Sequence, residues 1–223
     1  DAFSLMLSHD VLCRAVAAAE ATGRTPRASW AEVRDNLYLP VRSDKVIAAH
    51  DAFRIDEPKG ATPSPLGGLF PGGYQTDEAV ERRTLDFYLA HWRDYVGAPM
   101  LPALYGVWAA RTGDRTLALK LFEEGYAAYD AGRFHQCLEY RPDHPDSETA
   151  AGPFFANLGG MLLGLLFGFT GLDPKGDPAH WPDRPVVLPE GWRAISVERL
   201  WFGGRTASLR ADQGAERAVI KFH

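Results

Sequence analysis

The sequence predicts a mainly α-helical chain that ends in a small antiparallel β region. Apolar residues recur at helical spacing through most of residues 1–172. Beyond Gly171 the residues alternate between apolar and polar or are β-branched, with turn signals at Pro189-Glu190-Gly191 and Gly203-Gly204. We therefore expect residues 1–172 to form a helical domain and residues 173–223 to form the start of a β-sandwich-like region.

Five amphipathic or mixed helical segments are expected within residues 1–132. We place them at residues 3–23, 28–39, 76–95, 99–113 and 114–132. In the second segment Ser29 can cap the first turn, with Glu32 as its capping-box partner. Thr76 is the expected cap of the third segment. Between these two segments, the many Pro and Gly residues of 40–76 predict a long irregular connection.

Residues 152–172 read GPFFANLGGMLLGLLFGFTGL, and no charged residue occurs between Glu148 and Asp173. Length alone would allow this segment to cross a bilayer. Its glycines, Pro153 and Asn157 weaken that interpretation, and amphipathic helices precede it without a basic flank. We expect a helix that is packed on most sides, in which Gly159 and Gly160 let a backbone or a sugar approach closely.

The β region should contain short strands. We expect them at residues 186–189, 194–202, 206–212 and 217–222.

Composition argues against several classes of function. A net charge of −5 and a pI near 5.8 disfavour a nucleic-acid partner, and no run of Lys and Arg marks a membrane surface. Cys13 and Cys137 are expected to be reduced thiols, which indicates a cytoplasmic location. Dispersed histidines and acidic residues without EF-hand spacing predict no metal site. GGLFPGG at 67–73 follows no strand, so no nucleotide cofactor is expected.

Several motifs together resemble a known family. They are Trp30, Tyr38-Leu39-Pro40, His50-Asp51-Ala52-Phe53, AVERRTLDFY at 79–88, Gly159-Gly160 with LLFGFTGL at 165–172, and LPEGW at 188–192. In this order they resemble the C-terminal part of glycoside hydrolase family 65. The likeness is greatest to its hydrolase branch, which includes the enzyme that removes glucose from glucosylgalactosyl-hydroxylysine.

The resemblance implies about the last half of an (α/α)6 toroid, followed by the opening strands of a β-sandwich. It also implies an inverting hydrolase whose general acid lies upstream of Asp1, so that the chain starts inside a longer protein and is inactive on its own. HQCLEY at 135–140 matches the segment of the general base, which places Glu139 in that role. The interval from Glu139 to Gly159 is about five residues longer than in the family, and Asp143, Asp146 and Glu148 are rivals in the same loop.

Phosphorolysis is a further possibility within the family. Its phosphorylases bind phosphate through a His-Ser pair, and YVGAPMLPA at 95–103 contains neither residue at the matching place. The family's Lys-Gln pair matches Lys59 and Gly60, so the resemblance retains Lys59 as a sugar ligand. Water is therefore the expected acceptor, and Lys59, Gly159 and Gly160 are the expected substrate-binding residues.

Two other hypotheses stay open from the sequence. The chain could be a non-catalytic α/α-toroid module used for carbohydrate binding or assembly, or residues 152–172 could associate with a membrane. For the favoured hypothesis, the expected partners are a carbohydrate substrate and the rest of the catalytic domain.

Overall fold

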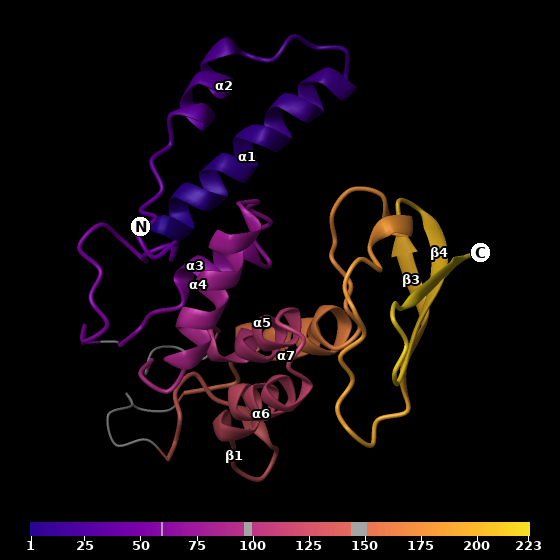
Figure 1. Cartoon of the computed structure of the whole chain (residues 1–223). Helices are drawn as coiled ribbons and strands as arrows, with labels where there is room; N and C mark the ends of the chain where they lie inside the picture. The colour runs from indigo at the N-terminus through magenta and orange to yellow at the C-terminus, as the bar shows by residue number, and fades with distance from the viewer. Residues whose placement is uncertain (59, 96–99, 144–150) are drawn as a thin grey trace. The chain divides into compact units, whose positions relative to one another are not determined.

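The computed structural model describes residues 1–58, 60–95, 100–143 and 151–223. The chain divides into two compact units, Asp1–Tyr95 and Val96–His223. Helices make up the first unit and the first part of the second, and the larger sheet comes last (Figure 1). The prediction of a helical chain followed by a small antiparallel β region is thus confirmed. The domain boundary at residue 172 stays a prediction.

Unit 1 contains the helices α1 (Ala2–Ala21), α2 (Ala28–Asp35), α3 (Ser64–Leu69) and α4 (Glu78–Ala90). In Figure 1, α2 runs back beside α1, and the two helices are in contact. α3 lies inside the stretch that was expected to be irregular. Its Pro65, Gly67 and Gly68 hide a helical pattern, although a proline in the first turn is compatible with a helix.

Both predicted helix caps of this unit are wrong by one residue or more. Ser29 lies inside α2, which follows Arg27 and has no side-chain cap. At α4 it is Asp77, and not Thr76, whose carboxylate accepts the backbone N–H groups of Ala79 and Val80. Aspartate caps a helix at least as well as threonine, so the helix begins after the better acceptor.

The core of unit 1 joins the irregular stretch to α4. Tyr88 is fully buried and donates its hydroxyl to the carbonyl of Ile47 at 3.1 Å. The Thr84 hydroxyl accepts the N–H of the same residue at 3.0 Å. Met6 of α1 packs against Gly68, where a Cβ would come within 2.4 Å of its sulfur. These contacts satisfy the backbone polar groups of Ile47 and hold the long connection against two helices.

Unit 2 begins with a compact helical group. Its elements are the 3-10 turn η1 (Pro102–Leu104), α5 (Tyr105–Arg111), α6 (Arg115–Tyr126), the 3-10 turn η2 (Ala127–Tyr129), the short strands β1 (Asp130–Ala131) and β2 (Gln136–Cys137), and α7 (Phe155–Leu163). Tyr105–Ala110 of α5 are buried throughout. Rings from distant parts of the chain meet edge to face, with centroids 5.2 Å apart for Phe122 and Phe169 and 5.4 Å apart for Phe169 and Trp192. This aromatic contact ties the end of the apolar run to α6.

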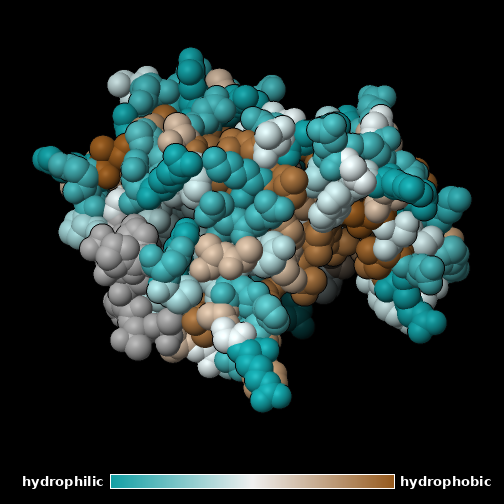
Figure 2. Space-filling model, turned by 90° about the horizontal axis from the view of Figure 1, so that it is seen from below, coloured by the Kyte–Doolittle hydropathy of each residue, from teal (hydrophilic) through white to brown (hydrophobic). Residues whose placement is uncertain are grey.

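The apolar run at 152–172 forms α7, which continues as one π-helical stretch, η3 (Gly164–Gly168). At about 1.5 Å per residue, Phe155–Gly168 extends only about 21 Å, short of the roughly 30 Å of a bilayer core. Phe155 and Leu162 are 73% and 59% exposed, and the buried residues of α7 are Asn157 and Gly160. The described part of the chain therefore does not pack this helix on most sides, contrary to the prediction. Apolar residues also reach the surface in the middle of the face seen in Figure 2.

In the described part of the chain, the helix that is long and apolar enough to span a membrane is α1, with 20 residues. Core helices and signal sequences share these properties, so the finding is weak evidence for a membrane span.

The larger sheet is formed by β3 (Ala194–Phe202), β4 (Arg205–Asp212) and β5 (Val219–Phe222), paired antiparallel in the order β3-β4-β5. The strand expected at 186–189 does not form. Val186, Val187 and Leu188 are buried, and the Val187 N–H donates to the carbonyl of Phe169. This apolar stretch therefore packs against the end of the helical run and pairs with no strand among the described residues.

Candidate active site

Glu139 follows β2 on a segment that is hydrogen-bonded on two sides. The Leu138 N–H donates to the carbonyl of Tyr129 at 2.9 Å, and the Glu139 N–H donates to that of Ala151 at 2.6 Å. The Phe154 N–H in turn donates to the carbonyl of Cys137 at 2.8 Å. These bonds fix the backbone of Glu139 between the end of α6 and the start of α7, with its side chain half-buried. The main chain at this candidate base is therefore held by hydrogen bonds on both sides.

The rival Asp143 is engaged elsewhere. Both of its oxygens accept from the guanidinium of Arg141, at 3.0 Å each, and Arg141 also reaches Glu124 of α6 at 3.4 Å. The pKa of Arg141 is raised by its hydrogen bonds to Asp143. A carboxylate held by a guanidinium is a weaker base, so Asp143 is the poorer candidate. The other two rivals, Asp146 and Glu148, lie outside the described residues.

A hairpin that was not predicted from the sequence precedes Glu139 in the chain. β1 and β2 pair through Asp130 with Cys137 and Ala131 with Gln136. His135 in the turn has a positive φ of 49° and lies 2.9 Å from the Asp130 carboxylate. Burial raises the pKa of the Cys137 thiol. Strands of two residues are too short to show an alternating pattern in the sequence, and only Gly132 in the turn indicated that the chain reverses there.

The adjacent glycines Gly159 and Gly160 of α7 have different surroundings. Gly160 is buried, and a Cβ there would lie 2.5 Å from that of Ala103 in η1. Gly159 is exposed, with nothing within 4 Å of the place of a Cβ. Together with four other residues they line an apolar groove of about 460 Å³; these are Met100, Leu104, Ala156 and Leu163. Gly160 thus serves a close approach within the protein, whereas Gly159 leaves space for a partner.

Asn157 is a polar residue of α7 that was not among the predicted site residues. It is fully buried, and neither its amide nitrogen nor its amide oxygen has a hydrogen-bond partner in the described part of the chain. Leaving such a group unsatisfied costs about 1–3 kcal/mol. A water or a ligand hydroxyl that reached it would remove this cost. The sequence feature that could have indicated Asn157 is its amide side chain within the uncharged run at 152–172.

Lys59 lies outside the described residues, but its neighbour Gly60 lies in the part of the chain that the structure describes. Gly60 has a φ of 69°, and a Cβ there would lie 1.5 Å from the carbonyl oxygen of Asp94. No side chain fits in this backbone. The close approach of two backbone segments within unit 1 therefore requires a glycine at this position.

An ion cluster beside the end of the apolar run was also missed. The Asp173 carboxylate is 4% exposed and lies 3.3 Å from the guanidinium of Arg111, 3.3 Å from the ammonium of Lys175 and 3.4 Å from the guanidinium of Arg184. Burial by itself would raise the pKa of Asp173, but the three cations lower it below the usual value. Lys175 is two residues from Asp173, but Arg111 is 62 residues away, so the sequence around Asp173 does not predict the whole cluster. In the described residues no group of three or more His, Cys, Asp or Glu could hold a metal.

Comparison with known proteins gives a distant similarity to a glycoside hydrolase. No protein-family model matches the chain. A kojibiose hydrolase of Mucilaginibacter mallensis is 24% identical over 198 residues, which are 88% of this chain and 28% of that protein. A kojibiose hydrolase of Flavobacterium johnsoniae is 23% identical over 182 residues, which are 81% of this chain and 25% of that protein. The chain therefore spans about a quarter of the length of these curated relatives.

Proposed function

We propose that this chain is the C-terminal portion of an inverting α-glycoside hydrolase of family 65, which cleaves an α-glucoside by attack of water. The carrying observation is the similarity to two kojibiose hydrolases over more than four-fifths of the chain. The order of the motifs along the sequence supports the same family. In this proposal the helices of residues 1–172 form about the last half of an (α/α)6 toroid.

Glu139 is the general base of the proposed reaction. An inverting enzyme needs two carboxyl groups about 6.5–9.5 Å apart, so that a water fits between the base and the sugar. The Glu139 carboxylate would take a proton from this water as the oxygen attacks the anomeric carbon. The glycosidic oxygen leaves from the opposite face and is protonated by an acid outside this chain. The backbone hydrogen bonds from Leu138 to Tyr129 and from Glu139 to Ala151 support this role, because they hold the main chain of Glu139 in place.

The apolar surface of α7 supports the rest of the catalytic domain as a partner. Phe155 and Leu162 are largely exposed, and the groove at Gly159 is lined by apolar residues. Burying such a surface contributes roughly 25 cal/mol per Å². A covering segment from the remainder of the toroid would complete the packing of this surface. Lys59 and Gly159 stay as proposed substrate-binding residues, and a cytoplasmic location stays part of the proposal.

Replacement of Glu139 in the full-length protein tests the proposal. With kojibiose as the substrate, we expect glucose to be released first as the β anomer, which proton NMR resolves. We expect Glu139→Gln to lower kcat by about 10²–10⁴-fold, the range for a general base. Glu190→Gln, at an exposed turn of the same unit, is the matched control and should leave kcat unchanged.

Two outcomes would count against this assignment. Activity that survives Glu139→Gln would favour the non-catalytic module, or another base if Asp143→Asn abolished it instead. Glucose release by the isolated 223-residue chain would show that no upstream acid is needed.

A further inference from the structure

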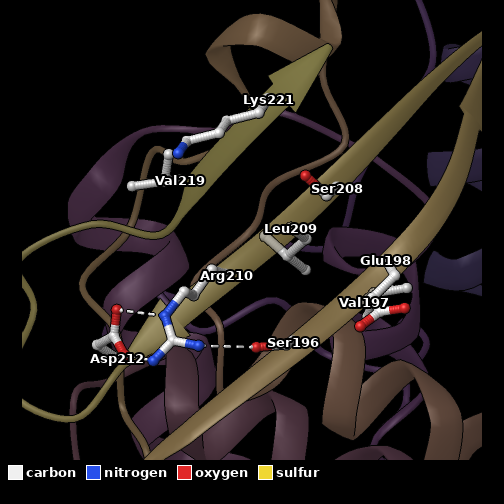
Figure 3. A pocket seen from close by; sticks show the side chains of 9 residues that line it. All are labelled: Ser196, Val197, Glu198, Ser208, Leu209, Arg210, Asp212, Val219 and Lys221. Atoms are coloured by element: carbon white, nitrogen blue, oxygen red, sulfur yellow. Dashed lines mark hydrogen bonds and ion pairs between the residues drawn. The ribbon is translucent and has the colours of Figure 1, made fainter. Parts of the chain in front are cut away.

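The outward face of the β3-β4-β5 sheet carries a polar groove of about 330 Å³ (Figure 3). Ser196, Arg210 and Val219 pair across the three strands, and Ser208 pairs with Lys221 in the next row. Directly paired residues point to the same side of a sheet. The residues of β4 that alternate with Ser208 and Arg210 are all buried, so the groove lies on the solvent side of the sheet; they are Ala207, Leu209 and Ala211.

A β-bulge adds an exposed tryptophan to this face. Ser196 and Trp201 are five residues apart, so a regular strand would place them on opposite sides of the sheet. The register shifts between Val197 and Leu200, which inserts one extra residue into β3. Trp201 then pairs with Thr206 and points to the same side as Ser196. Bulges are known to redirect side chains in this way. Trp201 is 66% exposed, although the indole is a large apolar ring.

The polar groups along the groove are held in place by one another. Arg210 donates to both carboxylate oxygens of Asp212 and, at 3.2 Å, to the hydroxyl of Ser196 (Figure 3). His223 lies 3.1 Å from the hydroxyl of Ser208. Arginine and serine can each make further hydrogen bonds beyond these. From Thr206, the partner of Trp201, to Arg210 the strand rises about 13 Å, which is the length of a short oligosaccharide.

The charge of the groove selects among ligands. Its lining contains two carboxylates, Glu198 and Asp212, and two cations, Arg210 and Lys221, so its formal charge is zero. A nucleic acid or a phosphorylated ligand requires an excess of cations, which this lining lacks. A ligand with many hydroxyl groups and an apolar ring face matches both the hydrogen-bonding groups and the exposed indole.

We propose that this sheet face is a second carbohydrate-binding site, separate from the candidate active site. Trp201 stacks against the C–H face of one pyranose ring, and Arg210, Ser196 and Ser208 hydrogen-bond the hydroxyls of the neighbouring units. The proposal goes beyond the hydrolase assignment and uses none of its residues. It gives the β region a role in holding a glucan chain, whether or not Glu139 is a base.

Fluorine NMR of the whole chain labelled with 5-fluorotryptophan tests this site. The six tryptophans give separate signals, and Trp201→Phe assigns that of Trp201. On titration with kojibiose or maltotriose, we expect the Trp201 signal to shift saturably. Trp201→Ala should weaken binding by about ten-fold, a free-energy loss of about 1.4 kcal/mol. Calorimetry measures this loss, and unmoved signals of the other tryptophans show that the variant is folded.

Two control variants show whether the sugar binds at this sheet face or elsewhere on the chain. Tyr38 is also largely exposed, at 68%, but it lies in unit 1, so Tyr38→Ala should not change the affinity. Glu139→Gln should leave the Trp201 shift unchanged, which keeps this result independent of the catalytic proposal. A Trp201 signal that does not respond to either sugar would overturn the inference. So would a signal that changes with protein concentration alone, because Trp201 would then belong to a contact between copies.

Discussion

The two adjacent glycines of α7 allow a sharp test of the packing beside the candidate site. Alanine at either position gains helix propensity, worth about 0.8–1.0 kcal/mol relative to glycine. At Gly159 the new methyl group meets nothing within 4 Å. At Gly160 it would lie 2.5 Å from the Cβ of Ala103 and 3.3 Å from the carbonyl carbon of the same residue. The propensity gain is common to both variants, so their difference isolates the steric cost.

Overpacking of a buried contact costs about 1–3 kcal/mol. Gly159→Ala should therefore stabilise unit 2 by up to about 1 kcal/mol. Gly160→Ala should be about 1–3 kcal/mol less stable than Gly159→Ala, because η1 must shift away from α7. Urea denaturation of the chain, followed by tryptophan fluorescence and by far-UV circular dichroism, measures both values. Coincident transitions by the two probes are required before the free energies are compared.

Equal stabilities of the two variants would refute this packing of α7 on η1. A loss of stability in Gly159→Ala would mean that its open side is covered in solution. The same variant also tests the binding role of Gly159 in the full-length enzyme. If a sugar approaches this backbone, Gly159→Ala should raise KM without any loss of stability.

Two further predictions concern the buried side chains of Asp173 and Cys137. Asp173→Asn removes the negative charge that the buried Arg111 faces. We expect the free energy of unfolding to fall by about 2–3 kcal/mol. This is near the lower end of the range for a broken buried ion pair, because the contacts of Asp173 with Arg111 and Arg184 are 3.3–3.4 Å long. The exposed pair of Asp212 provides the control, since Asp212→Asn should cost only about 0–1 kcal/mol in the same urea titration. Because the fold lowers the pKa of Asp173, its contribution to stability is complete above about pH 5 and is lost as the pH falls through the folded pKa. Asp173→Asn should therefore flatten the acid side of the curve of unfolding free energy against pH. An unchanged slope of that curve would contradict this prediction. Thiol titration should label the half-exposed Cys13 first and the buried Cys137 only at the rate of opening, and equal rates would argue against the burial of Cys137.

The helices of this chain were predictable where one face is apolar and the ends carry polar residues. α4 and α6 fulfil both conditions, and each begins within about two residues of its predicted start. Both helices end earlier than predicted, at Ala90 and at Tyr126. α3 was missed because a six-residue helix rich in proline and glycine has too few positions to show a period. The supposed strand at 186–189 failed for a different reason. Burial makes any short stretch apolar, and only pairing distinguishes a strand from a packed loop.

The residues of the candidate site also fall into those that the sequence could indicate and those that it could not. Glu139 was proposed from a motif whose residues are contiguous in sequence, and its role stays a prediction. The ion cluster at Asp173 and the buried amide of Asn157 depend on contacts that fold topology creates, and a single sequence carries no record of them. At Gly60, too, only the structure shows what the residue does, because the neighbouring backbone is distant in sequence. The backbone of Asp94 leaves no room for a side chain at that position.

The position of Trp201 shows how much depends on one inserted residue. Read as a regular strand, AISVERLWF places Trp201 on the same side as Ile195 and Val197, and thus in the core. The bulge reverses this alternation, so Leu200 faces the buried Ala207 while the indole faces solvent beside Thr206. Trp201 is 66% exposed, so it forgoes about two thirds of the roughly 150–250 Å² of mostly apolar surface that a buried tryptophan removes from water. A side chain in that position contributes little to the core of unit 2, and this is the physical reason to expect that a ligand covers it.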